Sequence, residues 1–547
     1  MEQATVIAEM TLDEQIGQTL VIGFAGTTVS PEVAELIRDG HVGGVILFSR
    51  NVRDARQLRD LTSALQRVAR RAGHRYPLLI TIDEENGVVR RLGAGTTVFP
   101  GNMALGAAGA GELTRAIARA TGRELRALGV TMNLAPVVDV NNNPANPVIG
   151  VRSFGEDPAL VAHLGAAAVR GYRDAGVLTA LKHFPGHGDT AVDSHLALPA
   201  IEHGLERLDT VELVPFRAGI DAGADAVTVA HIAFPRLTGD GRPATVAPVI
   251  IQGLLRERLG FDGVILSDCM EMDAIAGTLG VDQGAVTALR AGIDLVFVSH
   301  RHDRQWASIA AIRAAVAGGA LPGETVRRAA ERVLRLKAHG PSWDDLPAAD
   351  APLPDWVGGE EHRRLAHDAY ERAITLVRNE DGRVPLRPGA DDRLLVVYPG
   401  HESPLWPDDT RHQQGFFVES VRRRHPRVEA VALPTRPTSD ERAEVLRRAE
   451  GAATVVVATM NANLYDEQAE LVRDLDAAGR RVVVVAVYNP YDLLVFPGVR
   501  TYLAAYEYTP PALEAATRVL FGEIAPGGRL PVTLPGLYER GHGLSSY

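Results

Sequence analysis

Cysteine, lysine and long apolar runs are all scarce in this chain, and the scarcity of cysteine and of apolar runs excludes certain classes of protein. Cys269 is the single cysteine among 547 residues, so no disulfide can form within the chain. No stretch reaches the ~18 consecutive apolar residues that a membrane-spanning helix needs. The segment Met1 to Gly23 has neither the basic start nor the apolar run of a secretion signal. These shortages predict a cytoplasmic protein without membrane spans.

Positive charge is scarce as well. The formal net charge is −11 and the pI is 5.9, and no basic block offsets the acidity. This balance argues against nucleic acid or an anionic membrane as the main partner. The apolar content of 46% and the charged content of 23% are typical of an ordinary globular protein. A length of 547 residues exceeds the usual size of one core, so two domains are expected.

Short, continuous apolar runs recur along the first part of the chain, with helical patterns between them. Continuous runs are typical of strands that are buried on both faces of a parallel sheet. Eight such runs lie near residues 20–23, 42–48, 78–82, 132–138, 178–181, 226–230, 263–266 and 293–298. Their number and spacing predict an α/β fold, a (β/α)8 barrel of the TIM type, over residues 1–340.

A second, smaller domain is predicted after the barrel. Residues 341–360 are rich in proline, glycine and aspartate, which is typical of a linker between domains. Beyond it, apolar runs at 394–397, 454–457 and 482–485 again alternate with helical stretches. This pattern predicts a C-terminal α/β sandwich domain over residues 361–547.

Polar residues follow directly after six of the predicted barrel strands. They are Asp83 with Glu84 and Glu85, Asp139, Lys182 with His183, His231, Asp268, and His300. Barrel enzymes place their chemistry at the carboxyl ends of the strands. We therefore expect these side chains to meet in an active site.

The densest polar segment runs from Lys182 to His195. It holds three histidines, two aspartates and one lysine within fourteen residues, and its proline and glycines prevent a continuous helix. Of the 57 basic residues only Lys182 and Lys337 are lysine. A lysine kept beside two histidines indicates a site that uses a compact ammonium group.

Asp268 ends another predicted strand, in Ser-Asp-Cys-Met-Glu-Met at 267–272. This segment, together with Lys-His-Phe-Pro-Gly-His-Gly-Asp at 182–189 and Asp-Ser-His at 193–195, resembles glycoside hydrolase family 3 in its N-acetyl-β-glucosaminidase branch. Segments 141–158, 374–379 and 521–532 also resemble that family, so the likeness extends nearly from end to end. The resemblance implies that Asp268 is the nucleophile, that His195 is the acid/base, and that Asp193 orients His195.

The resemblance also implies a set of sugar-binding residues, namely Asp83, Arg91, Arg152, Lys182 and His183. One segment departs from the family pattern. The family commonly reads Asp-x-Glu-Gly-Gly-Arg-Val-x-Arg after the third strand, and here Val88 replaces the middle arginine. Either Arg90 supplies the missing contact, or Val88 fills space beside the strand.

The residue types suit glycoside cleavage on physical grounds. A retaining enzyme traps the oxocarbenium-like state with a carboxylate, and water then resolves the glycosyl-enzyme. Asp268 must be ionised for this role, and a nearby cation such as Lys182 favours the ionised form. Histidine titrates near neutral pH and can serve as both acid and base. A carboxylate such as Asp193 would fix its tautomer. Neither metal nor organic cofactor is required.

We therefore predict a retaining exo-β-N-acetylglucosaminidase that acts on small oligosaccharides, either chitobiose or peptidoglycan-derived fragments, as a monomer or a homodimer. A β-N-acetylglucosaminide phosphorylase is an alternative, because a neutral histidine does not repel phosphate. A broader β-glucosidase is another. Two further alternatives belong to other functional classes. One is a non-catalytic sugar-binding or cell-wall-sensing module, and the other is a zinc or iron hydrolase. The metal site would use His183, His187, His195, His231 and Asp268, although their spacing lacks the usual metal-binding patterns.

Overall fold

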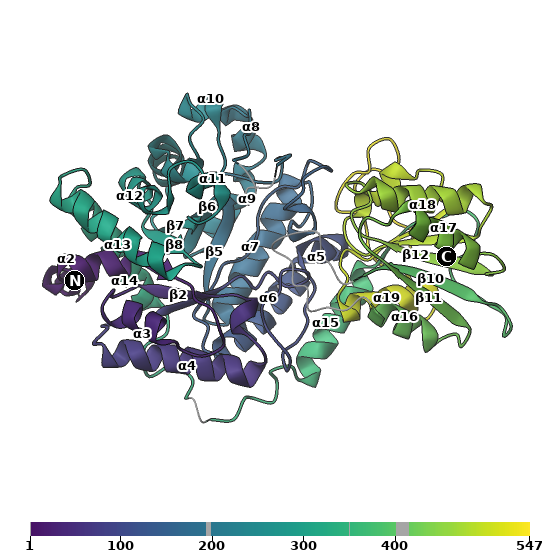
Figure 1. The fold of residues 1–547 in the computed structure, drawn as a ribbon, viewed down its shortest axis with the longest axis horizontal. Helices are drawn as coiled ribbons and strands as arrows, with labels where there is room; N and C mark the ends of the chain where they lie inside the picture. The colour runs from purple at the N-terminus through teal and green to yellow at the C-terminus, as the bar shows by residue number, and fades with distance from the viewer. Residues whose placement is uncertain (1, 193–197, 349–350, 401–414) are drawn as a thin grey trace.

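The structure, a computed structural model, describes residues 2–192, 198–348, 351–400 and 415–547. It comprises a closed eight-stranded parallel barrel followed by a separate six-stranded sheet with helices (Figure 1). The predicted fold class, a TIM-type barrel followed by an α/β sandwich, is confirmed. Within the described ranges no helix is both long enough and apolar enough to cross a membrane.

The barrel strands pair in chain order, and the last strand pairs with the first to close the barrel. The strands are β1 (Leu20–Ile22), β2 (Gly44–Leu47), β3 (Leu79–Ile82), β4 (Met132–Asn133), β5 (Leu178–Phe184), β6 (Ala226–Val229), β7 (Val264–Cys269) and β8 (Leu295–Val298). The α-helices of this domain are α1 (Glu2–Glu9), α2 (Leu12–Gln18), α3 (Pro31–Arg38), α4 (Ala55–Arg71), α5 (Asn102–Ala108), α6 (Gly111–Ala127), α7 (Pro158–Asp174), α8 (Leu205–Thr210), α9 (Leu213–Asp221), α10 (Pro235–Thr238), α11 (Asp273–Ala276), α12 (Val281–Ala291), α13 (His302–Ala317) and α14 (Gly323–His339). Shorter turns are η1 (Ser49–Asn51), η2 (Gly150–Arg152) and η3 (Ala244–Val246), and η4 (Val249–Arg258) is a π-helix.

Each of the eight predicted apolar runs overlaps a strand, and two of the strands extend further than predicted. β5 continues to Phe184 and β7 to Cys269. Lys182, His183 and Asp268 therefore lie on the last residues of strands, and the prediction that they follow the strands was wrong by a few residues. The flanking residues, Leu181 and Phe184 in β5 and Leu266 and Cys269 in β7, are paired with the neighbouring strands. The register shifts between them, where Lys182, His183 and Asp268 lie.

The inside of the barrel is a packed core. Side chains from the strands form one apolar cluster, which includes Val21, Ile46, Leu79, Met132, Leu178, Leu266 and Phe297. Such layers of apolar side chains fill the interior of a TIM barrel. The polar groups of the site are therefore confined to the carboxyl end of the strands.

The second domain is built on a sheet with strand order β11-β10-β12-β13-β14-β9, in which β9 is antiparallel to β14 and the other neighbours are parallel. Its elements are α15 (Glu360–Ala373), β9 (Thr375–Asn379), β10 (Leu394–Pro399), α16 (Gly415–Arg422), β11 (Val428–Leu433), α17 (Ser439–Arg448), β12 (Thr454–Thr459), α18 (Asp466–Ala477), β13 (Val482–Ala486), η5 (Pro490–Val495), β14 (Thr501–Ala504) and α19 (Pro510–Leu520). Helices α17 and α18 cover one face, and α15, α16 and α19 gather on the other (Figure 1).

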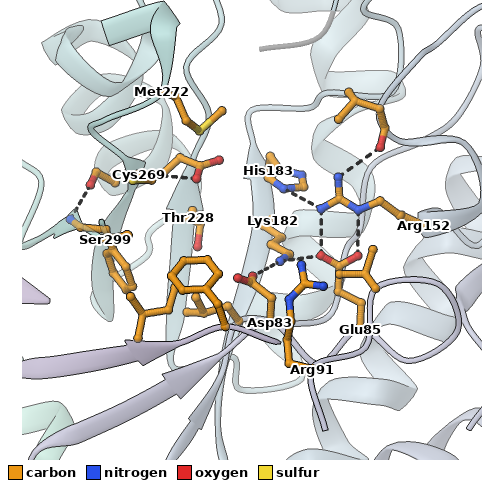
Figure 2. Close-up of a pocket in the computed structure, with 18 of the residues that line it drawn as sticks. Asp83, Glu85, Arg91, Arg152, Lys182, His183, Thr228, Cys269, Met272 and Ser299 are labelled. Carbon is orange, nitrogen blue, oxygen red and sulfur yellow. Dashed lines mark hydrogen bonds and ion pairs between the residues drawn. The ribbon is translucent and has the colours of Figure 1, made fainter. Parts of the chain in front are cut away.

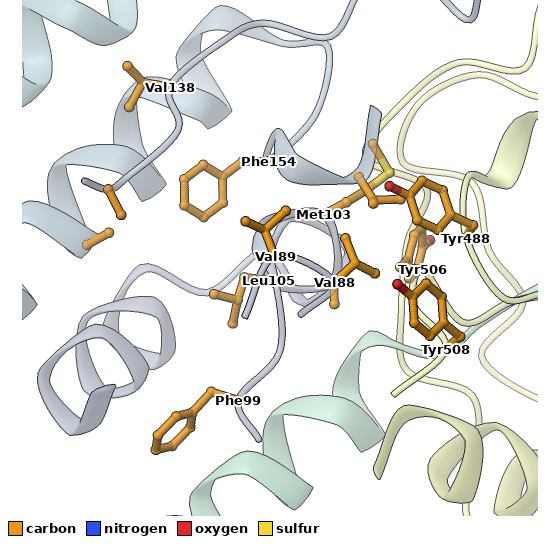
Figure 3. Close-up of a cluster of buried hydrophobic side chains, with 14 of the residues drawn as sticks. Val88, Val89, Phe99, Met103, Leu105, Val138, Phe154, Tyr488, Tyr506 and Tyr508 are labelled. Carbon is orange, nitrogen blue, oxygen red and sulfur yellow. The ribbon is translucent and has the colours of Figure 1, made fainter. Parts of the chain in front are cut away.

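The two domains are in direct contact. Helix α15 packs against α5 of the barrel. A buried cluster between the domains includes Val88 and Met103 from the barrel and Tyr488, Tyr506 and Tyr508 from the second domain (Figure 3). The second domain therefore lies beside the loops that follow β3 and β4.

Candidate active site

A cavity of about 290 Å³ opens at the carboxyl ends of the barrel strands (Figure 2). The predicted site residues that line it are Asp83, Arg91, Arg152, Lys182, His183 and Asp268. The structure thus brings together residues that are up to 185 positions apart in the sequence (268 minus 83). The two other predicted residues, Asp193 and His195, lie outside the described residues.

One wall of the cavity is a buried network of two cations and two carboxylates. The Nε and Nη2 atoms of Arg152 each donate to one carboxylate oxygen of Glu85, at 2.8 Å. The ammonium group of Lys182 lies 2.7 Å from Glu85 and donates to Asp83 at 2.6 Å (Figure 2). This arrangement compensates both cations and holds them in fixed positions.

The network keeps Glu85 and Lys182 ionised. Burial alone would raise the pKa of Glu85, but the adjacent Arg152 and Lys182 outweigh it and hold that pKa well below the usual range. Burial would likewise lower the pKa of Lys182, but Asp83 and Glu85 raise it above its ordinary value. A ligand therefore meets charged donors and acceptors, which form strong hydrogen bonds with sugar hydroxyls.

His183 is oriented by a second buried carboxylate. Its Nδ1 lies 2.7 Å from Asp139, which also accepts the backbone N–H of His187 at 2.7 Å. Burial raises the pKa of Asp139, but His183 and these hydrogen bonds lower it below its usual value. With Nδ1–H donating to the carboxylate, Nε2 is free to accept, and it lies 3.3 Å from Nη2 of Arg152.

Asp268 lines the same cavity. Its Oδ1 accepts the backbone N–H of Cys269 at 2.7 Å. Figure 2 shows Cys269 and Met272 across the cavity from His183 and Arg152. Because Asp268 lines the cavity together with the ionic network, its carboxylate lies at the surface that a bound ligand would contact.

Two residues that complete the site, Glu85 and Asp139, were expected there only as polar residues that follow strands. Neither was assigned a catalytic or sugar-binding role. Each is fully or almost fully buried and bonded to a predicted residue, Glu85 to Arg152 and Lys182 and Asp139 to His183. Their position after a buried strand was the available signal, because a carboxylate there requires a partner.

Val88 does not face the cavity. Its side chain is 3% exposed and lies among the apolar residues between the domains (Figure 3). Arg90 is buried as well, and its Nη2 donates to the carbonyl of Gly93 and to the hydroxyl of Thr96. The structure thus supports the interpretation that Val88 fills space.

The described histidines of the alternative metal site, namely His183, His187 and His231, are engaged in other contacts. Nδ1 of His231 lies 2.7 Å from Thr245 Oγ1, and its Nε2 lies 2.9 Å from the carbonyl of Cys269. Among the described residues, Cys269, Glu271 and His300 form a different group, whose possible ligand atoms lie within 4.8 Å of one another. Burial raises the pKa of the Cys269 thiol to about 12, which opposes the thiolate that a metal requires.

A polar pocket at the carboxyl end of a (β/α)8 barrel is the arrangement of a barrel enzyme. Two sequence profiles match the chain, "Glycosyl hydrolase family 3 N terminal domain" over residues 11–336 and "Glycosyl hydrolase family 3 C-terminal domain" over residues 374–540. The chain therefore belongs to glycosyl hydrolase family 3.

Individual relatives cover almost the whole chain. Beta-hexosaminidase A of Pseudoalteromonas piscicida is 32% identical over 96% of this chain and 97% of its own length. A family 3 β-N-acetylglucosaminidase from Paenibacillus sp. FPU-7 has 42% identity and a TM-score of 0.89 over 96% of this chain and 99% of that one. A fungal multi-domain β-N-acetylglucosaminidase has 42% identity and a TM-score of 0.91. The match covers 97% of this chain but 62% of the fungal one.

Proposed function

We propose that the protein is a retaining exo-β-N-acetylglucosaminidase that hydrolyses non-reducing terminal β-linked GlcNAc. The observation that carries the proposal is that Asp268 lines the same pocket as Asp83, Arg152, Lys182 and His183. The names of the full-length relatives, β-hexosaminidase and β-N-acetylglucosaminidase, support the same activity.

In the proposed mechanism Asp268 attacks the anomeric carbon of the bound sugar. The bond from that carbon to the leaving oxygen breaks, and His195 gives its proton to that oxygen. The neutral His195 then takes a proton from water, whose oxygen displaces Asp268 and releases the sugar with its original anomeric configuration. Asp193 would fix the tautomer of His195 and stabilise its charged form.

The ionic network has a binding role in this proposal. Asp83 and the two cations can exchange hydrogen bonds with several hydroxyls of one terminal sugar. Energy from these remote contacts helps to orient the anomeric carbon against Asp268. A pocket suits a chain end better than an internal unit, which favours exo cleavage.

Water is the proposed acceptor. A phosphorylase needs cations that are available to hold a phosphate dianion beside the anomeric carbon. Lys182 and Arg152 are each paired with carboxylates at 2.6–2.8 Å, so much of their charge is already compensated. The proposed substrates are chitobiose or peptidoglycan-derived fragments in the cytoplasm, and the proposed state is a monomer or a homodimer.

The test is a panel of nitrophenyl β-glycosides of GlcNAc, glucose and xylose, beside chitobiose and a muropeptide disaccharide. We expect kcat/KM for the GlcNAc glycoside to exceed that for the glucoside by several orders of magnitude if the site hydrogen-bonds the amide. Comparable rates on both would indicate a general β-glucosidase. Products are compared in phosphate and in another buffer of equal ionic strength. Free GlcNAc in both supports hydrolysis, whereas GlcNAc 1-phosphate as the main product in phosphate contradicts it.

A further inference from the structure

The described residues that line the cavity all lie between Ile46 and His300. Among the described residues, the second domain therefore contributes no side chain to this lining. It nevertheless contacts the loop that forms one wall of the site, without lining the cavity itself. Residues 141–152, which follow β4 and end in Arg152, are here called the Arg152 loop. The chain segments that follow β12 and β13 meet this loop.

Three contacts join the second domain to the Arg152 loop. Nδ2 of Asn463 donates to the carbonyl of Pro144 at 2.9 Å. The hydroxyl of Tyr491, at the start of η5, accepts a hydrogen bond from Nδ2 of Asn141 at 3.0 Å. Asn489 packs so closely on Gly150 that a Cβ added there would lie 2.9 Å from its Oδ1.

Asn141 links Tyr491 to the turn that carries Arg152. While its Nδ2 donates to Tyr491, its Oδ1 accepts the backbone N–H of Gly150 at 3.1 Å. Gly150 is the first residue of η2 and has φ of +45°, and Arg152 is the last residue of the same turn. Asn141 and Tyr491 are 0% and 1% exposed, so water does not readily replace either partner.

We propose that Tyr491 is a positioning residue for Arg152, acting through Asn141 and Gly150. This inference rests on the proposed function, because it gives Arg152 a role in holding the terminal sugar. The second domain thereby takes part in substrate binding without reaching the substrate. Removal of the Tyr491 hydroxyl leaves the buried amide of Asn141 without that acceptor, and a polar group left unsatisfied drives local rearrangement. A shift of Arg152 weakens its contacts with the sugar, since binding groups act only within narrow geometric limits.

The experiment compares Tyr491→Phe with Tyr506→Phe in the full-length chain. Tyr506 is a matched control, because it is equally buried in the second domain and its hydroxyl bonds to Thr375 of that same domain. Kinetics are measured on a nitrophenyl GlcNAc glycoside, affinity for free GlcNAc by calorimetry, and Tm by scanning calorimetry. We expect Tyr491→Phe to raise KM and the Kd of GlcNAc about tenfold, the size of one buried hydrogen bond, with a smaller change in kcat. Its Tm is expected to match that of Tyr506→Phe.

A double-mutant cycle with Asn141→Ala tests whether Tyr491 acts on Arg152 through Asn141. If Tyr491 acts through Asn141, adding Tyr491→Phe to Asn141→Ala changes KM little further. Additive effects, or a Tyr491→Phe variant whose KM equals that of Tyr506→Phe, would overturn the proposal. A wild-type protein that does not cleave the GlcNAc glycoside would overturn both this inference and the proposed function, so the two failures are distinguished by the wild-type assay.

Discussion

Arg152 and Glu85 form a two-point ion pair in the wall of the cavity, with Nε and Nη2 of the guanidinium each 2.8 Å from a carboxylate oxygen. One of those oxygens also lies 2.7 Å from the ammonium group of Lys182. A single buried carboxylate thus fixes two cations that are proposed to bind sugar. Breaking such a pair is costly, because the cations would stay buried without their counter-charge.

Glu85→Gln is expected to reduce the free energy of unfolding by about 3–5 kcal/mol and kcat/KM by about 100-fold or more. Because the folded-state pKa of Glu85 is lowered, its stabilisation is present above the unfolded pKa and is lost as pH falls toward the folded one. The gap between wild type and variant in urea unfolding should therefore shrink below about pH 4.

Glu84→Gln is the matched control for this change. Glu84 is also buried, but there burial outweighs the nearby Arg90 and Arg91 and raises the pKa of the carboxyl group. The backbone N–H groups of Arg91 and Leu92, which it accepts, can still be accepted by an amide oxygen. Equal losses in the two variants would contradict a special role for the Glu85 ion pairs.

Asp268→Asn is expected to reduce turnover at least about 10⁴-fold, since an amide does not form the glycosyl-enzyme. Its oxygen can still accept the backbone N–H of Cys269, so folding and GlcNAc binding should change little. A 2-fluoro sugar with a good leaving group should label Asp268 in the wild type, as read by peptide mass spectrometry. A label on Asp83 or Asp139 would show that the nucleophile is misassigned.

The role of His195 as acid/base is tested by comparing substrates whose leaving groups differ in quality. His195→Ala should slow glycosides with poor leaving groups strongly, by about 10²–10⁴-fold, because they need protonation. Dinitrophenyl glycosides should be affected much less in the glycosylation step. Asp193→Ala should give a weaker form of the same pattern. If every substrate loses the same factor, His195 binds substrate and does not protonate it.

The fold and much of the cavity lining could be predicted because both depend on local sequence. Continuous apolar runs mark strands buried on both faces, and polar residues at their ends, such as Lys182 and Asp268, must gather at one end of a barrel. Strand β11 was not predicted, because its sequence Val-Glu-Ala-Val-Ala-Leu lacks a continuous apolar run and its side chains are mostly half-buried.

The partnerships inside the site could not be predicted in the same way. Glu85 and Arg152 are 67 positions apart, and Asn141 and Tyr491 are 350 apart. Such pairs depend on how the loops after different strands meet, and no spacing within one segment encodes that. Space filling by Val88 was one of two interpretations, but its partners were equally hidden, since they include tyrosines of the other domain.

Val88→Arg introduces the arginine that the family commonly has at this position. In this chain the new side chain would enter the apolar cluster formed with Met103, Tyr506 and Tyr508 (Figure 3). We expect a loss of about 3 kcal/mol or more in unfolding free energy, because a large charged group is buried without a partner. Val88→Ile is the control: it adds one methylene and no charge, and should cost about 1–3 kcal/mol, less than the arginine. An arginine variant that is stable and binds GlcNAc more tightly would contradict the space-filling role.

Lys337 should make the stability of the protein depend on pH. It is 3% exposed, it donates to Oε1 of Gln18 at 2.7 Å, and burial lowers its pKa to about 7. Between pH 7 and the unfolded value of about 10.4, the unfolded chain binds a proton that the folded chain does not. Stability therefore rises with pH across that window. Lys337→Met removes this dependence and should gain about 1 kcal/mol or more relative to wild type at pH 7.

The measurement is urea unfolding of wild type and Lys337→Met at pH 7, 8 and 9. Other titrating groups cancel in the difference between the two proteins, so that difference should shrink steadily as pH rises. Arg335→Met, at an exposed position on the same helix, is the control. Its unfolding free energy should change with pH as that of wild type does. If the unfolding free energy of Lys337→Met changes with pH as that of wild type does, Lys337 keeps its proton in the folded state. The contact with Gln18 then stabilises the charge more than burial destabilises it.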